Sequence, residues 1–389
     1  MNFDEIIERR NTHSMKWDLM ETFYGVSPDN GLAMWVADMD FRPPPAVNDA
    51  LQAMVDHGVH GYFGNEGEHK QAICQWMHKR HNWNPAPEAI HTVHGLVNGT
   101  ALCIQAFTRP GDGIILFTPV YHAFSRVIRA NQREVIESPL VNNGGRYELD
   151  LEALAGQLTG HETMLIFCSP HNPSGRVWTK AELQAVADFC IEHDLVLVSD
   201  EIHHDLVYAS ARHTAMARLA EQQEALRKRL VMLTATTKTF NIAGGLTGNV
   251  IIEDDNLRAK FAMAHQASGT SPNRFGTMIA TAAYQHGEAW LEELIPYLDE
   301  NRKLLDEGIN AIPGLSSMPM ESTYLAWVDF SSSGLTQEQI IHKVQNEAGI
   351  AVNHGSVFGK GGENFLRFNF ATPRSRVEEA VKRLQRVFG

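Results

Sequence analysis

The chain has 389 residues, 43% hydrophobic and 20% charged, the balance of a globular protein with room for two domains. A net charge of −13 and the lack of a basic stripe argue against a nucleic-acid partner. No apolar run reaches the roughly 18 residues of a membrane span. Because the charged N-terminus also lacks the apolar core of a signal peptide, we expect a cytoplasmic protein.

Cysteine and histidine give no sign of disulfides or of a metal. The four cysteines, Cys74, Cys103, Cys168 and Cys190, are scattered, mostly within apolar runs, and no two have a paired spacing. We therefore expect reduced, buried thiols. The 19 histidines include the adjacent pair His203-His204, but none falls in a zinc-ligand spacing, so the sequence predicts no metal site.

Short β-type runs alternate with helical stretches through the middle of the chain. The predicted strands are 113–117, 134–137, 164–168, 195–199, 230–234 and 249–252. Thr179, with Glu182 three residues later, forms a capping box that begins a helix reaching 193. The alternation predicts an α/β fold with a mostly parallel sheet covered on both faces.

The alternation ends near Pro272, where a region of different character begins. We predict a long, mainly helical region over 275–308, bent near Pro296. Strands at 324–330 and 365–370 and helices at 336–348 and 374–388 follow. This pattern is typical of a smaller α+β domain. The predicted organisation is an N-terminal segment (1–45) packed with the small domain, a large domain (46–285) and a small C-terminal domain (286–389).

Two polar residues follow the ends of two predicted strands. Asp200 comes directly after the run 195–199, and Lys238 lies just beyond 230–234. Open α/β sheets bind ligands at the carboxyl ends of their strands. A lysine and a carboxylate there suit pyridoxal 5′-phosphate (PLP), because the lysine forms a Schiff base with its aldehyde and the acid keeps its ring nitrogen protonated. Taken singly, a solvated loop lysine and a helix-capping aspartate are the alternatives.

Two other strand ends and one helix start offer contacts for the same group. Asn172, in a polar turn after 164–168, can donate to the cofactor's phenolic oxygen, although such a turn is also ordinary loop sequence. Tyr121 can stack on a planar ring, with core packing an equal alternative. The helix that starts at Gly95-Leu96-Val97 offers free N–H groups to a phosphate.

Arg367 lies inside an alternating strand, 365–370, between apolar residues. An arginine in such a place needs a partner. The carboxylate of an amino-acid substrate would give the planar, bidentate pairing that guanidinium favours. A structural salt bridge to an acid such as Asp329 is the alternative.

Together these motifs resemble the fold-type-I PLP enzymes of the aminotransferase class I/II family, over the whole chain. The matching motifs are Asn172-Pro-Ser-Gly175, Ser199-Asp200-Glu201, Lys238-Thr-Phe-Asn-Ile-Ala-Gly and Arg367. Lys16-Trp-Asp18, Met34-Trp-Val-Ala-Asp-Met-Asp-Phe41 and Asp200-Glu-Ile-His203 look like the MalY/PatB-type cystathionine β-lyases. The resemblance implies the PLP-dependent transferase fold, with a homodimer that shares its active sites.

The resemblance also implies roles for individual residues. Lys238 would hold PLP and act as base, Asp200 would pair with the ring nitrogen, and Tyr121 would stack on the ring. Asn172 would contact the cofactor and, with Arg367 and Tyr62, the substrate. The remaining cofactor contacts would be His203, Gly95, Leu96, Val97, Thr237, Thr247 and Tyr62, the last reaching the phosphate of the neighbouring subunit.

The chain departs from the family pattern at the phosphate site. Many members carry Arg or Lys eight residues after the lysine and Ser three residues before it, where this chain has Leu246 and Ala235. A hydrogen bond to a charged group is worth about 1.5–3 kcal/mol. We therefore expect threonine hydroxyls, backbone amides and Tyr62 to hold the phosphate.

The implied activity is a carbon–sulfur β-lyase that cleaves cystathionine or related cysteine S-conjugates to pyruvate, ammonia and a thiol. An aminotransferase would begin from the same carbanion and remains an alternative, as does a regulatory protein that keeps the fold and the cofactor. The positions expected around the thiol, 35–41, His122 and Tyr324, are mostly apolar or neutral, which favours an uncharged thiol over one with a second carboxylate.

Overall fold

Seven strands form one large sheet in the computed structural model, which describes residues 1–389. In spatial order they are β2 (Ile90–Val93), β10 (Gly248–Ile251), β9 (Leu230–Thr234), β8 (Val196–Asp200), β7 (Glu162–Cys168), β3 (Gly113–Thr118) and β4 (Glu134–Pro139). β10 runs opposite to the other six strands, which share one direction. The predicted α/β fold with a mostly parallel sheet is confirmed, and β2 is a strand that the sequence analysis did not predict.

Successive side chains of each central strand enter two different cores, because side chains alternate between the faces of a sheet. In β3, Ile115 and Phe117 belong to the larger core, and Ile114 and Leu116 to the smaller one. Helices α4 (Gly67–His81) and α8 (Lys180–Glu192) contribute to the larger core. The smaller core is built with α5 (Leu96–Phe107), α6 (Ala123–Ala130) and α12 (Asp255–Ala267). The sheet is therefore covered on both faces.

Helix α8 begins as its sequence predicts. The Thr179 hydroxyl accepts from the Glu182 amide at 3.3 Å, and the Glu182 carboxylate accepts from the Thr179 amide at 2.8 Å. Such a cap is worth about 1 kcal/mol. The buried side chains of the helix include Leu183, Val186, Ala187 and Cys190, which recur at the predicted helical spacing.

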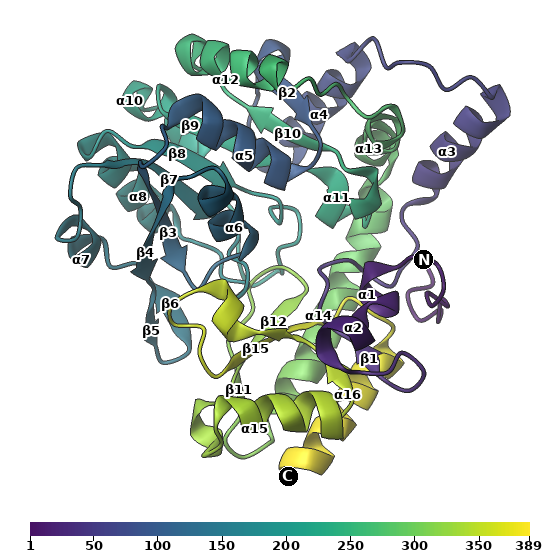
Figure 1. Ribbon diagram of the computed structural model, residues 1–389. Coiled ribbons are helices and arrows are strands. Elements are labelled where there is room, and N and C mark those ends of the chain that lie inside the picture. Colours follow the sequence, from purple (N-terminus) through teal and green to yellow (C-terminus); the bar gives the residue numbers. More distant parts are fainter.

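A second, antiparallel sheet lies near the C-terminus (Figure 1). Its order is β11 (Ser316–Ser317), β12 (Leu325–Asp329), β15 (Phe365–Asn369) and β14 (Asn353–His354). The register pairs Arg367 with Trp327 on one side and Asn353 on the other. The predicted helices appear as α15 (Gln337–Ile341), which continues as a π-helical turn over His342–Glu347, and α16 (Arg374–Phe388).

The N-terminal segment joins this second sheet region through a short strand. Strand β1 (Leu32–Ala33) pairs in parallel with β13 (Ile350–Ala351). Figure 1 shows α1 (Met15–Asp18) and α2 (Met20–Tyr24) beside β1 and close to α16. Helix α3 (Pro45–His57) stands at the margin of the molecule and is joined to α4 by an extended connection.

The prediction that 275–308 is mainly helical is confirmed, but it did not include the break at Gly287. Two helices, α13 (Arg274–His286) and α14 (Glu288–Asn310), meet at Gly287, and Pro296 stands inside α14 without ending it. A Cβ atom on Gly287 would lie 2.5 Å from the Phe240 ring and 2.5 Å from the Ala283 carbonyl oxygen. Glycine therefore allows the close approach of backbone to ring at the junction. Figure 1 shows α14 running from the large sheet region to the second sheet.

The remaining elements are short and lie in the connections. They are β5 (Val141–Asn143), β6 (Arg146–Glu148), α7 (Leu151–Ala155), α9 (Ala217–Ala220), α10 (Glu224–Arg227) and α11 (Thr236–Thr239). All four cysteines are free and all but Cys74 are buried, in agreement with the expectation of reduced thiols. No helix has the length and apolar character needed to cross a bilayer.

Candidate active site

The carboxyl ends of the parallel strands meet around one cavity of about 520 Å³. Asp200 is the last residue of β8, and the register places it beside Cys168 at the end of β7. Lys238 lies in α11, directly after β9. The predicted site residues that line this cavity are Lys238, Asp200, Asn172, Tyr121, Arg367, His203, Thr237, Leu96 and Val97.

The amine of Lys238 is held by a backbone carbonyl of the N-terminal segment. Its Nζ donates to the Ala37 oxygen at 2.6 Å, and the Tyr324 hydroxyl donates to the same oxygen at 2.9 Å. Burial lowers the pKa of Lys238 to about 8, the Asp38 carboxylate opposes that shift, and Arg367 adds to it. A substantial share of the amine is therefore neutral near pH 8, as a proton acceptor requires.

Asp200 is a buried acid without an ion pair in the chain. One of its oxygens accepts from the Ile202 amide at 3.1 Å. Burial raises the pKa of Asp200 to about 7, and the adjacent Glu201 acts in the same direction. A cation placed against this carboxylate would stabilise its ionised form.

Arg367 is buried, yet no carboxylate of the chain pairs with it. Its guanidinium donates to the Asn172 side-chain oxygen at 3.0 Å, to the Trp35 carbonyl at 2.9 Å and to the Asn353 side-chain oxygen at 2.6 Å. Its Nε has no partner, and burial lowers the pKa of Arg367 to about 10. Asp329 accepts from Ser331 instead, so the alternative of a salt bridge between Arg367 and Asp329 is wrong.

Asn172 and Tyr121 complete the central part of the cavity. The Asn172 side-chain oxygen accepts from Arg367, which leaves its amide nitrogen without a hydrogen bond in the chain. The Tyr121 ring packs edge-on against Phe124, with 5.5 Å between centroids, and still lines the cavity. One face of a planar group in this cavity can therefore meet the tyrosine ring.

Three predicted site residues lie outside the cavity of their own chain. Gly95 precedes α5 with φ of 82° and does not line the cavity. The Thr247 hydroxyl donates to the Gly245 carbonyl at 3.1 Å. Tyr62 is 99% exposed, in the irregular connection between α3 and α4. Leu246, in contrast, does line the cavity.

The sequence profile of the aminotransferase class I and II family matches residues 32–384. The chain belongs to this family. Cystathionine β-lyase PatB of Bacillus subtilis (strain 168) is 37% identical over 388 residues, which cover 99% of each chain.

Two solved structures share the whole fold with this aminotransferase-family chain. A PLP-bound putative aminotransferase from Clostridium difficile 630 is 36% identical, with a TM-score of 0.95 and 100% of each chain covered. Cystalysin from Treponema denticola, which contains a pyridoxal 5′-phosphate cofactor, is 35% identical, with a TM-score of 0.94 over 99% of this chain and 98% of that one. These likenesses establish the predicted fold type I.

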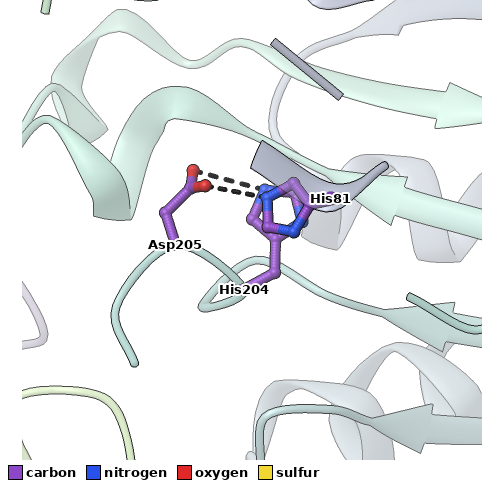
Figure 2. A group of neighbouring side chains, drawn as sticks. All are labelled: His81, His204 and Asp205. Carbon is purple, nitrogen blue, oxygen red and sulfur yellow. Dashed lines mark hydrogen bonds and ion pairs between the residues drawn. The ribbon is translucent and has the colours of Figure 1, made fainter. Parts of the chain in front are cut away.

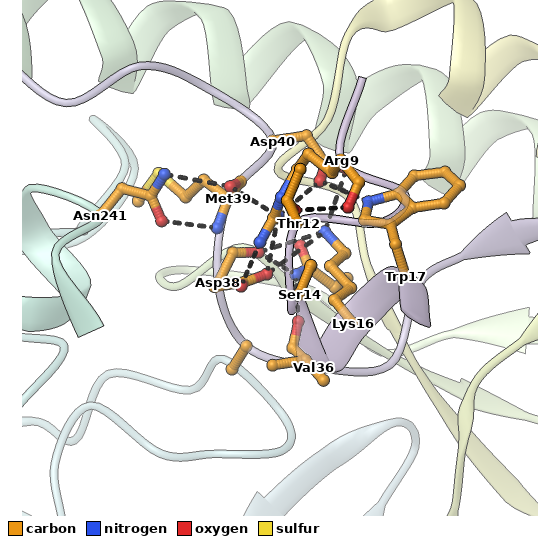
Figure 3. Close-up of polar contacts among 12 residues, drawn as sticks. Arg9, Thr12, Ser14, Lys16, Trp17, Val36, Asp38, Met39, Asp40 and Asn241 are labelled. Atoms are coloured by element: carbon orange, nitrogen blue, oxygen red, sulfur yellow. Dashed lines mark hydrogen bonds and ion pairs between the residues drawn. The ribbon is translucent and has the colours of Figure 1, made fainter. Parts of the chain in front are cut away.

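The roof of the cavity in this family member is the N-terminal segment 35–41. The Asn241 side chain bonds to the backbone of Met39 and Phe41, and the Asn369 side chain donates to the carbonyls of Val36 and Asp38. Asn241, in the segment that follows β9, and Asn369 of β15 therefore bond to the same segment from two directions. Figure 3 shows Asn241 reaching this segment from the side opposite Trp17.

A buried ion network anchors the roof. Lys16 Nζ lies 3.1 Å from one Asp40 oxygen, and Trp17 Nε1 and Arg9 donate to the other at 3.0 and 2.8 Å (Figure 3). Burial alone would raise the pKa of Asp40, but Lys16 and Arg9 hold it below its usual value. Arg376 of α16 also approaches Asp40, at 3.4 Å, which ties the network to the second sheet region.

Sequence reasoning missed a buried cluster of histidines and acids behind the cavity. His81 and His204 stack with 4.0 Å between ring centroids, and their Nε2 atoms face the two oxygens of Asp205 at 2.8 and 3.4 Å (Figure 2). The planes of the two rings are 21° from parallel. One ligand atom from each of His81, His204 and Asp205 lies within 4.8 Å of the other two, so the cluster has the side chains of a possible cation site as well as those of a hydrogen-bond network.

Sequence reasoning also missed two residues that support Arg367. Asn353 accepts from the guanidinium and donates to the Tyr24 hydroxyl at 2.9 Å. Both residues line the cavity. Asn353 belongs to a strand of two residues and Tyr24 to a short helix, so neither carries a motif or a periodic pattern that points to a site.

Proposed function

We propose that the protein is a PLP-dependent carbon–sulfur β-lyase that cleaves cystathionine or related cysteine S-conjugates to pyruvate, ammonia and a thiol. The observation that carries the proposal is one cavity with three complementary groups. These are a lysine of lowered pKa, an acid without an ion pair and an arginine without a carboxylate partner. The similarity of the chain to cystathionine β-lyase PatB and to cystalysin also supports the proposal.

The residues around the cavity fit PLP. Lys238 would hold its aldehyde and Asp200 its ring nitrogen, while Tyr121 and His203 would border the ring. The free amide nitrogen of Asn172 suits the phenolic oxygen. The phosphate would meet the first N–H groups of α5, at Leu96 and Val97, and Thr237. When bound, PLP supplies an electron sink that stabilises negative charge at the α-carbon of an amino acid.

The chain's own groups account for the remaining steps. Arg367 binds the substrate carboxylate in a buried setting, where Asn172, Trp35 and Asn353 fix the orientation of the guanidinium. The Lys238 amine, held at the Ala37 carbonyl, removes the proton from the α-carbon. Once that proton is lost, the thiolate at Cβ can leave. Conversion of the remaining three-carbon fragment to pyruvate and ammonia consumes one water molecule, which can enter through the open mouth of the cavity beside Met15, Phe23 and Val357.

The activity is tested with purified holoenzyme and cystathionine in the absence of any keto acid. We expect pyruvate to form. An aminotransferase, the alternative that the family name supplies, would need a keto-acid acceptor and would release no pyruvate from cystathionine. A strict requirement for the acceptor would therefore reverse the proposal.

Lys238→Ala tests the central assignment. We expect the variant to lose turnover and the visible absorbance of bound cofactor, because no other amine lines the cavity. Circular dichroism checks that the variant folds. Normal turnover by a folded Lys238→Ala protein would end the assignment of this lysine.

We propose further that the protein is a homodimer in which Tyr62 completes the phosphate site of the neighbouring subunit. The support is the full exposure of Tyr62, together with the exposed Val55 and Val59 in the same region. We expect light scattering to give twice the chain mass. Tyr62→Ala should weaken PLP binding at least tenfold, since a hydrogen bond to a charged phosphate is worth about 1.5–3 kcal/mol; a monomer of unchanged PLP affinity would contradict this.

A further inference from the structure

The cavity has no charged side chain left over for the far end of a substrate. Its charged residues are Asp200, Lys238 and Arg367, and the proposed reaction uses each of them at the ring nitrogen, the aldehyde and the α-carboxylate. Two histidines also line it, but burial lowers the pKa of His122 to about 4 and that of His203 well below 6.5, so both are neutral at pH 7. A second charged group on the substrate would find no partner of opposite charge among the side chains that line the cavity.

An apolar wall leads outward from Arg367. The guanidinium donates to the Trp35 carbonyl, and the Trp35 ring contacts Tyr24 at 5.0 Å and Phe23 at 5.5 Å between centroids. All three aromatic residues line the cavity. The wall therefore begins where the substrate carboxylate binds and continues into α2.

The outer end of this wall is apolar and open to solvent. Phe23 is 57% exposed, Met15 53% and Val357 48%, and all three line the cavity. They come from α2, α1 and the connection after β14, so separate parts of the chain place apolar side chains at the same mouth. Exposed apolar groups gathered at a cavity are typical of a binding surface.

We propose that this wall, formed by Met15, Phe23, Tyr24, Trp35 and Val357, binds an uncharged, apolar substituent on the substrate sulfur. The preferred substrates are then S-alkyl and S-aryl cysteines, and cystathionine, whose thiol half carries an ammonium and a carboxylate, is a poor one. This inference rests on the proposed lyase activity and specifies its substrate class.

The physical reason is a difference in desolvation. Each methylene moved from water onto an apolar surface gains about 0.8 kcal/mol, close to a fourfold increase in affinity. Moving a charged group into the same surroundings without a partner is unfavourable. The first effect favours an apolar substituent on sulfur, and the second disfavours a charged one. Two substrates of equal carbon count that differ only in charge therefore test the inference.

S-butyl-L-cysteine and L-cystathionine form such a pair, because both carry four carbons beyond the sulfur and differ in the two charged groups. With holoenzyme we expect kcat/KM for pyruvate release to rise about threefold per carbon from S-methyl to S-butyl, and to be at least tenfold higher for S-butyl-L-cysteine than for cystathionine. Equal or faster cleavage of cystathionine overturns the inference and leaves the lyase activity intact. If no conjugate yields pyruvate, the proposed function itself fails.

Phe23 is the residue whose replacement tests the wall. Phe23→Ser should lower the ratio of kcat/KM for the S-butyl substrate over the S-methyl substrate about tenfold. Leu19→Ser is the matched control, since Leu19 is also an exposed apolar residue beside α2 but does not line the cavity. It should leave the ratio unchanged. The same ratio in wild type and Phe23→Ser would overturn the role of the wall.

A binding measurement removes the dependence on turnover. L-2-aminooctanoate and 2,7-diaminosuberate are the analogues of the two substrates in which a methylene replaces the sulfur, so neither has a leaving group. Calorimetry on the holoenzyme should show at least tenfold tighter binding of L-2-aminooctanoate, with Phe23→Ser removing most of that difference. Tighter binding of 2,7-diaminosuberate would overturn the inference.

Discussion

Lys238 and Arg367 are two cations buried around one cavity, and the charge on Arg367 affects Lys238. Arg367 adds to the lowering of the pKa of Lys238 that burial begins. A substrate carboxylate on Arg367 would cancel this repulsion, so binding of substrate would make Lys238 a stronger base at the moment when it must take a proton. The pairing of the two residues thus links recognition of the carboxylate to the acid–base step.

Tyr324→Phe tests whether the Ala37 carbonyl positions the lysine. The Tyr324 hydroxyl and the Lys238 amine donate to the same oxygen, so loss of the hydroxyl should leave the amine less well held. A hydrogen bond contributes about 1 kcal/mol, and we expect kcat to fall about fivefold to tenfold with KM within twofold. Steady-state kinetics on the holoenzyme provides the measurement.

Tyr284→Phe is a suitable control for that variant. It also removes a buried hydroxyl, which bonds to Asn249 at 3.1 Å, but Tyr284 does not line the cavity. We expect its kcat to match the wild type. If Tyr324→Phe and Tyr284→Phe share an unchanged kcat, the Ala37 carbonyl has no positioning role.

Residues at the ends of parallel strands were predictable from the sequence, and residues of the roof were much less so. Asp200, Asn172 and Lys238 follow apolar runs, and the sheet geometry alone brings such positions to one edge. The Ala37 contact is made by a backbone carbonyl, which any residue type could supply. Asn353 reaches Arg367 through the register of β14 and β15, and no local pattern encodes that pairing.

At the scale of elements, predictions failed where packing decided the outcome. The capping box of α8 is local chemistry, and it was predicted to the residue. The break between α13 and α14 lies at Gly287, where a Cβ atom would come too close to the Phe240 ring. Phe240 is distant in sequence, so the sequence pattern pointed to Pro296 and not to Gly287. Thr247 does not line the cavity, and its hydroxyl donates to the Gly245 carbonyl, so its role as a cofactor contact stays a prediction.

The Asp40→Asn substitution tests how much the buried ion network contributes to holding the N-terminal segment in place. The change leaves the fully buried Lys16 without its closest carboxylate. Removing one partner of a buried pair costs about 3–5 kcal/mol, so the urea midpoint should fall clearly. Because the Asp40 pKa is held below its usual value of 3.8, its contribution is present above that pH and is lost only as the pH falls further.

The matched control is Glu8→Gln, which removes the charge from an exposed pair with Arg10. Its urea midpoint should stay at the wild-type value, since exposed ion pairs contribute little. The gap between wild type and Asp40→Asn should be constant from pH 8 to pH 5. Equal midpoints for wild type and Asp40→Asn would show that the network does not hold the roof.

For the whole molecule, buried neutral histidines make stability depend on pH. Burial lowers the pKa of several histidines from 6.5, among them four to about 4 and a fifth to about 3. The four are His69, His81, His91 and His122, and the fifth is His171. Between about pH 4 and 6.5 the unfolded chain binds protons at these positions and the folded chain does not. Stability should therefore rise with pH across this window.

His171→Gln tests this on the most strongly shifted of the five. The ring is buried, with Nδ1 at 2.8 Å from the Ser174 hydroxyl and Nε2 without a partner, so a glutamine can keep one bond without taking a proton. Near pH 5 the wild-type protein takes up about one proton at His171 when it unfolds, and the variant should not. The slope of its unfolding free energy against pH should therefore be smaller than that of the wild type by about 1.4 kcal/mol per pH unit. Urea titrations from pH 4.5 to 7.5 measure that slope. The exposed His78 of α4 provides the control, because His78→Gln should keep the wild-type slope. Parallel curves for all three proteins would refute the proposed effect of the buried histidine on stability.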